Sequence, residues 1–142
     1  MILRSQLWGC LIWIQLSLAN FAKALTPATS PEKIVLQQLE SLQKDDMEGV
    51  YEFASPNNKL QTGSVDQFGQ MVRGGPYKYL IGHRKAEILI ASNMAASKQY
   101  LVRVFPSERG ESKVMEYWWS LSRCKTGPYV GCYMVDAVIP NM

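Results

Sequence analysis

Residues that could do chemistry are few, and most lie in the second half of the 142-residue chain. Asp136 interrupts the apolar run YMVDAV, where a carboxylate is unfavourable unless it is paired or hydrogen-bonded. His83, the one histidine, could exchange a proton near neutral pH. Asp136 and His83 are therefore the candidate catalytic residues, provided that both side chains reach one pocket. A structural or solvent-exposed role is the alternative for each, and we favour it for both.

The last two predicted strands, 113–124 and 132–140, align as a simple hairpin. This register puts Ser120 opposite Asp136, where its hydroxyl could hydrogen-bond the carboxylate. The same register also pairs Ser122 with Met134, and Trp118 with Val138. Because side chains alternate between the two faces of a sheet, the expected core face comprises Tyr117, Trp119, Leu121, Val135, Ala137 and Ile139. Asp136 then belongs to the opposite, mixed face, with Trp118, Ser120, Ser122, Cys124, Cys132 and Met134.

Two cysteines, Cys124 and Cys132, flank the seven-residue segment KTGPYVG and lie opposite each other in this register. Directly opposed residues have Cα atoms about 4.5–5.5 Å apart, a spacing compatible with a disulfide. We therefore predict a disulfide between them, with two reduced thiols as the alternative. Cys132 is a poor candidate nucleophile, because no histidine or lysine lies near it in sequence to lower its pKa.

No metal site or other cofactor is expected. The chain has one histidine, and its cysteines do not form a CxxC pair, whereas zinc needs three or four convergent ligands. The Gly-Gly-Pro at 74–76 is a helix stop, since the Gly-Lys-Ser/Thr ending of a phosphate-binding loop is missing.

Three residues are candidates for binding: Trp118, Arg84 and Ser120. An outward-facing Trp118 could anchor a partner protein or a second copy of the chain. Arg84, like Arg103, could receive a carboxylate or phosphate, or could instead pair with an acidic residue such as Glu116 on the sheet surface.

The elements that position these residues are helices followed by strands. Ser30 and Pro31 are a favourable helix start, and an apolar stripe continues to about Lys44. Two further helices are predicted over 45–56 and 64–76, with one more turn to residue 82. Strands are predicted over 83–91, 98–106, 113–124 and 132–140. The fold class is therefore α+β, with N-terminal helices packed on a curved antiparallel sheet of four or more strands.

The N-terminal segment has the features of a signal peptide. Residues 1–24 contain an early Arg4, an apolar stretch from Leu7 to about Phe21, and the small-x-small ending Ala-Lys-Ala. We predict cleavage after residue 24, then a linker over 25–30 and one domain over 31–142. The protein would be exported to a periplasm, a thylakoid lumen or the extracellular space. The alternative is an uncleaved membrane anchor.

Composition excludes some classes of partner. Hydrophobic residues make up 47 % of the chain and charged residues 19 %, which is typical of a globular domain. Removal of residues 1–24 would lower the net charge from +3 to about +1, and the basic residues are scattered. Nucleic acid is therefore not an expected partner. No apolar run after residue 24 is long enough to span a membrane, so no stable span is expected after processing.

Several segments carry a resemblance to a known family: VLQQLESLQKDD, YEFASPNNKLQTGSVDQFGQMVR, YKYLIGHRKAE, YWWSLSRC and GPYVGCYMVDAVIP. Over residues 31–140 the chain resembles a domain-of-unknown-function family. Its members are small proteins of photosynthetic lineages, and the domain recurs at the C-terminal end of a plant F-box protein. The resemblance implies a nuclear transport factor 2-like (cystatin-like) cone and suggests a homodimer, but no reaction. Cys124 departs from the family pattern.

These observations predict an exported, non-enzymatic module that binds a small apolar ligand or a protein partner. The alternative is a cavity enzyme, an isomerase or a hydrolase, that uses Asp136 and His83. The two hypotheses differ in geometry, because the enzyme requires both side chains to converge on one pocket.

Overall fold

The computed structural model describes residues 25–94, 96–107 and 113–142, so the predicted signal peptide lies outside the described residues. The helical elements are α2 (Pro31–Gln43), α3 (Met47–Glu52), α4 (Pro56–Thr62), α5 (Val65–Val72) and the 3₁₀ helix η1 (Gly75–Leu80). The strands are β1 (Lys85–Asn93), β2 (Lys98–Phe105), β3 (Met115–Arg123) and β4 (Tyr133–Pro140). None of the helices in the described ranges is long and apolar enough to cross a membrane.

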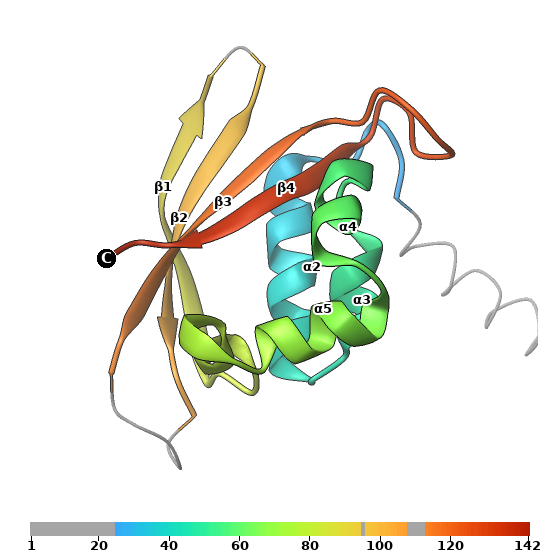
Figure 1. The fold of residues 1–142 in the computed structure, drawn as a ribbon. Coiled ribbons are helices and arrows are strands. Elements are labelled where there is room, and N and C mark those ends of the chain that lie inside the picture. Colours follow the sequence, from blue (N-terminus) through green and yellow to red (C-terminus); the bar gives the residue numbers. More distant parts are fainter. Residues whose placement is uncertain (1–24, 95, 108–112) are drawn as a thin grey trace, which may run out of the picture.

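The predicted α+β class is confirmed. The strands form one antiparallel sheet in the order β1-β2-β3-β4, which is curved and does not close into a barrel. Helices α2 to α5 lie together against one face of this sheet (Figure 1). The core between the two layers contains fully buried side chains from both, such as Ile34 and Val35 of α2 and Tyr117, Trp119 and Leu121 of β3.

Local capping determines where the helices begin. The hydroxyl of Ser30 accepts a hydrogen bond from the backbone N–H of Lys33, and Pro31 occupies the first turn of α2. Ser64 and Gln67 form the predicted capping box at the start of α5, where each side chain bonds the other residue's backbone. These contacts satisfy backbone donors that a helix leaves without internal partners.

Helix α4 differs from the sequence prediction. A helix end is predicted at Pro56, but Pro56 is instead the first residue of a separate helix. Ser55 caps α4 by accepting a hydrogen bond from the N–H of Asn58. Proline lacks an N–H donor, so it is equally compatible with the end of one helix and the start of the next.

The hairpin of β3 and β4 contains a bulge that the simple alignment missed. Ser122 pairs with Met134 as predicted, but the register shifts between Ser120 and Leu121, and Asp136 has no partner in the ladder. The predicted pairs of Ser120 with Asp136 and Trp118 with Val138 are therefore wrong. The observed pairs are Ser120 with Ala137, Trp118 with Ile139, and Trp119 with Val138.

At the bulge, Val135 has a second set of backbone partners outside the sheet. Its N–H donates to the carbonyl of Phe53 at 2.8 Å, and its own carbonyl accepts from the N–H of Ser55 at 2.8 Å. These bonds attach β4 to the connection between α3 and α4. The inserted residue then changes which side chains face inward: Val138 packs against the core, whereas Ile139, predicted to be buried, is 56 % exposed.

Candidate functional site

A cavity of about 210 Å³ lies between the helical layer and β4. The described helices from α2 to η1 all contribute to its wall, together with β3 and residues 135–139 of β4. Its apolar lining comprises Leu42, Val50, Phe68, Met71, Val72, Leu80, Trp119, Val135, Ala137, Val138 and Ile139. The polar or partly polar lining residues are Gln38, Asn58, Gln61, Thr62, Tyr77 and Asp136.

The polar groups deepest in this wall already have partners. The side-chain oxygen of Gln38 accepts a hydrogen bond from the indole N–H of Trp119 at 2.8 Å. The amide nitrogen of Gln38 donates to the carbonyl of Val50 at 2.9 Å. Within the described part of the chain, no buried side-chain polar atom lacks a partner. The cavity interior therefore presents mainly apolar surface to a ligand, because its buried side-chain donors and acceptors are already engaged.

Two side chains of the wall also hold the free edge of β4. The hydroxyl of Tyr77 donates to the carbonyl of Val138 at 2.9 Å, and the amide of Asn58 donates to the carbonyl of Val135 at 3.1 Å. The first contact gives the Val138 carbonyl a partner, and the second adds a donor to the Val135 carbonyl, which already accepts from the N–H of Ser55. The cavity wall is thus attached to the strand that carries Asp136.

Asp136 lines the cavity and is half-buried. The hydroxyl of Ser122 donates to Oδ2 of Asp136 at 2.6 Å. Ser122, and not the predicted Ser120, is therefore the hydroxyl partner of Asp136. The bulge explains the difference, because it moves Asp136 out of register with Ser120. No other described residue hydrogen-bonds the second carboxylate oxygen, Oδ1.

His83 is buried, with 4 % of its surface exposed, and it does not line the cavity. Its ring nitrogen Nδ1 donates to the carbonyl of Leu80 at 2.7 Å, since a carbonyl oxygen can only accept. Burial lowers the pKa of His83, although the hydrogen bond to Leu80 opposes that shift. The structure therefore does not bring His83 and Asp136 together in one pocket, as the two-residue enzyme hypothesis requires.

The other candidate binding residues, Trp118, Arg84 and Ser120, have other surroundings. Trp118 is half-buried, between Leu101 of β2 and Ile139 of β4 in the sheet. The guanidinium of Arg84 lies over the ring of Phe105, with 5.3 Å between the guanidinium carbon and the ring centroid. Ser120 is half-buried and pairs with Ala137. None of the three lines the cavity.

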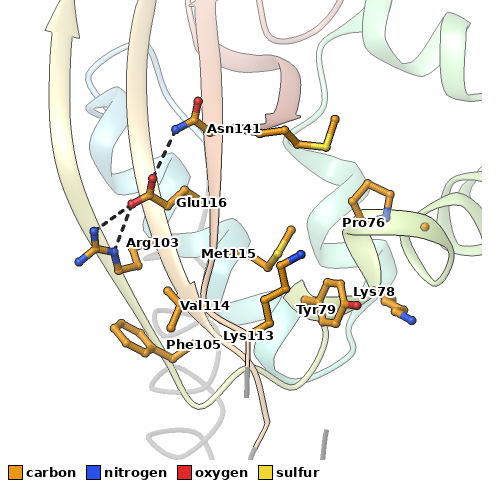
Figure 2. A pocket seen from close by; sticks show the side chains of 12 residues that line it. Pro76, Lys78, Tyr79, Arg103, Phe105, Lys113, Val114, Met115, Glu116 and Asn141 are labelled. Carbon is orange, nitrogen blue, oxygen red and sulfur yellow. Dashed lines mark hydrogen bonds and ion pairs between the residues drawn. The ribbon is translucent and has the colours of Figure 1, made fainter. Parts of the chain in front are cut away.

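A larger groove of about 950 Å³ lies between η1 and the end of the sheet that carries the C-terminus. Figure 2 shows Arg103, Glu116 and Asn141 on the sheet side of this groove, with Tyr79 and Lys78 on the opposite wall. Both Nε and Nη2 of Arg103 donate to Oε2 of Glu116, at 3.2 and 3.0 Å. Glu116 is therefore already paired on the sheet surface, which is one of the two arrangements predicted for Arg103.

Cys124 and Cys132 lie opposite each other, as the simple alignment predicts. The N–H of Cys124 donates to the carbonyl of Cys132 at 2.7 Å. Both are buried free thiols, and the predicted disulfide stays a prediction. Within the described residues, no group of three or more histidine, cysteine or acidic side chains is positioned to hold a metal ion.

Sequence reasoning missed most of the cavity wall. The burial of Gln38 could have been predicted from the sequence, because Gln38 lies four residues from both Ile34 and Leu42 on the apolar stripe of α2. A polar residue in such a stripe is expected to be buried with a specific partner. Tyr77 and Asn58 gave no comparable signal, since their role depends on contacts with a strand far along the chain.

A helical layer on one face of an open antiparallel sheet, with a mainly apolar and partly open cavity between the layers, defines an α+β domain. The family described as "Domain of unknown function (DUF4864)" matches residues 26–134, and the chain belongs to this family. No match was found among curated proteins or among solved structures.

Proposed function

We propose that this domain is a non-enzymatic module that binds a small apolar ligand in the cavity between the helices and β4. The observation that carries this function is the mainly apolar wall, whose deep polar groups are engaged with one another. Apolar surface with satisfied polar groups favours a ligand that needs few hydrogen bonds. The proposed fold is a nuclear transport factor 2-like cone, supported by the order of helices and strands and by the cavity between the helices and the sheet.

The cavity volume limits the size of the ligand. An apolar protein cavity of ~150 Å³ can bind benzene, so a cavity of about 210 Å³ suits a molecule with one ring or a short aliphatic chain. The free oxygen of Asp136 could accept one hydrogen bond from a hydroxyl or amino group of such a ligand. A phenol or a similar amphipathic ring compound combines both features.

The test uses protein-observed NMR titration with benzene, phenol and indole as probes. We expect chemical-shift changes at the cavity residues and dissociation constants on the order of 1 mM, given the small number of ligand atoms. The variant Val72→Phe should abolish the shifts, because Val72 is buried in the cavity wall and a phenyl ring would occupy the space. Leu60→Phe is the matched control, since Leu60 is 83 % exposed and outside the cavity.

Two outcomes would contradict ligand binding. One is the absence of any shift at cavity residues with all three probes. The other is unchanged binding in a Val72→Phe variant whose circular dichroism shows it to be folded. Because Asp136 lines the cavity, turnover of an ester or enol substrate that is lost in Asp136→Asn would instead favour the enzyme alternative.

Export is part of the same proposal and is supported by the composition of residues 1–24. N-terminal sequencing of the mature protein should begin at Leu25. An intact Met1 on membrane-associated protein would support the uncleaved anchor instead.

A further inference from the structure

The tip of the β3–β4 hairpin holds the two buried cysteines in a defined backbone arrangement. The N–H of Cys124 donates to the carbonyl of Cys132 at 2.7 Å, and the N–H of Gly131 donates to the carbonyl of Cys124 at 2.8 Å. Gly131 has a positive φ of 83°. Two residues, Gly131 and Cys132, thus oppose Cys124 in a glycine-type bulge, in which the first bulged residue is left-handed. This bulge fixes the register that sets the cysteines side by side.

Directly opposed residues of antiparallel strands have Cα atoms about 4.5–5.5 Å apart, within the range that a disulfide spans. The thiol of Cys124 donates to the carbonyl of Thr126 at 2.9 Å, inside the same loop. Bond formation therefore requires the Cys124 side chain to rotate away from Thr126.

Burial determines when such a bond can form. Cys124 and Cys132 are 9 % and 3 % exposed. Burial raises the pKa of the Cys132 thiol, and the neighbouring Cys124 adds to this shift. Since the thiolate is the reactive form, the folded hairpin reacts slowly with external disulfides, whereas the unfolded chain exposes both thiols.

We propose that Cys124 and Cys132 form a disulfide while the chain folds in an oxidising compartment, before the hairpin tip is buried. The oxidant is an external disulfide, either of a protein or of a small thiol. The thiolate of one cysteine attacks it and releases one external thiol, leaving a mixed disulfide. The second cysteine then attacks that bond and releases the other external thiol, so two electrons and two protons pass to the oxidant.

The bond would also stabilise the place where the linker meets the domain. One guanidinium nitrogen of Arg123, Nη1, donates to the carbonyl of Gly131 at 2.7 Å and to that of Pro27 at 3.3 Å. Figure 1 shows the hairpin tip beside the first described residues of the chain. A disulfide at the hairpin tip would therefore restrict the movement of the segment that Arg123 joins to Pro27.

The first experiment is peptide mapping of the full chain after oxidative refolding, with Cys10→Ser in all samples to remove the third thiol. Trypsin cleaves after Arg123 and Lys125, so the disulfide should link the dipeptide 124–125 to the peptide 126–142 under non-reducing conditions.

We also expect the Tm to fall by on the order of 10 °C after reduction, because the bond restricts the unfolded chain. Cys132→Ser is the control, and its Tm should not respond to reductant. Free thiols at both positions after oxidative refolding would overturn the inference.

A second experiment tests the order of events. The same protein, folded in reductant and then transferred to oxidised glutathione, should form the bond at least tenfold more slowly than the denatured chain. Equal rates in the folded and denatured states would show that burial does not control the reaction. Neither experiment depends on ligand binding in the cavity. A negative result in either one would therefore not affect the proposed ligand-binding function.

Discussion

The cavity and the groove differ in volume and in how deeply their lining residues are buried. The groove is larger, at about 950 Å³ against about 210 Å³, yet its charged side chains are exposed or paired at the surface. The cavity is smaller, and its wall is anchored by buried contacts such as that of Trp119 with Gln38. Volume alone is therefore a poor guide to a binding site. What distinguishes the cavity is that much of its wall is buried and that the deepest polar groups of the wall bond one another, whereas none of the residues lining the groove is buried.

If the cavity wall is part of the core, its residues should matter far more for stability than residues at the surface. Trp119→Ala should lower the free energy of unfolding by about 3–5 kcal/mol, because it removes a fully buried ring and leaves Gln38 without its indole partner. Urea denaturation would measure the change. Trp118→Ala is the matched control and should lose only about 1 kcal/mol, since Trp118 is half-buried. Similar losses in the two variants would contradict the distinction.

The same contrast between interior and surface applies to charge. The pKa of His83 is lowered by burial, so the unfolded chain binds its proton more readily than the folded one. The stabilisation that comes from keeping His83 neutral is fully present above pH 6.5, the ordinary pKa of histidine. It is lost as the pH falls through the lower pKa that His83 has in the folded state. Tm measured from pH 7.5 to 5 should therefore decrease. His83→Gln should flatten this decrease, and an unchanged slope would show that other groups dominate.

The smallest effect is expected in the groove. Arg103 and Glu116 form an ion pair with side chains that are 42 % and 27 % exposed, a setting in which such pairs contribute about 0–1 kcal/mol. Arg103→Ala should therefore lower the free energy of unfolding by less than about 1 kcal/mol. Glu116→Ala should lower it by a similar amount. The double variant should be little less stable than either single variant. A loss comparable to that of Trp119→Ala would mean that the groove, too, is part of the core.

Much of the fold could be predicted from local signals. Ser30 with Pro31 and Ser64 with Gln67 begin helices because their side chains bond backbone donors a few residues away. The alternating strands and their turns also gave the order of the sheet. Helix α4 was missed because Pro56 is compatible with either end of a helix, and only the packing of the chain decides between them.

The candidate site was far less predictable. Asp136 was identified as unusual from its apolar neighbours, but its partner was misassigned because alternation assumes an unbroken ladder. The other wall residues come from elements that are distant in sequence, as with Tyr77 and Val138, and no local pattern reports their proximity.

By itself, the sequence determined the class of fold, the start of its main helices and the opposition of Cys124 and Cys132. Each of these depends on residues close along the chain or on one hairpin turn. Only the tertiary structure decided the cavity, the separation of His83 from Asp136, and the hydrogen bond from Ser122 to Asp136. The physical reason is that these features depend on contacts between segments far apart along the chain, such as the bonds that join Val135 to the connection after α3 about 80 residues earlier, next to the bulge in the ladder.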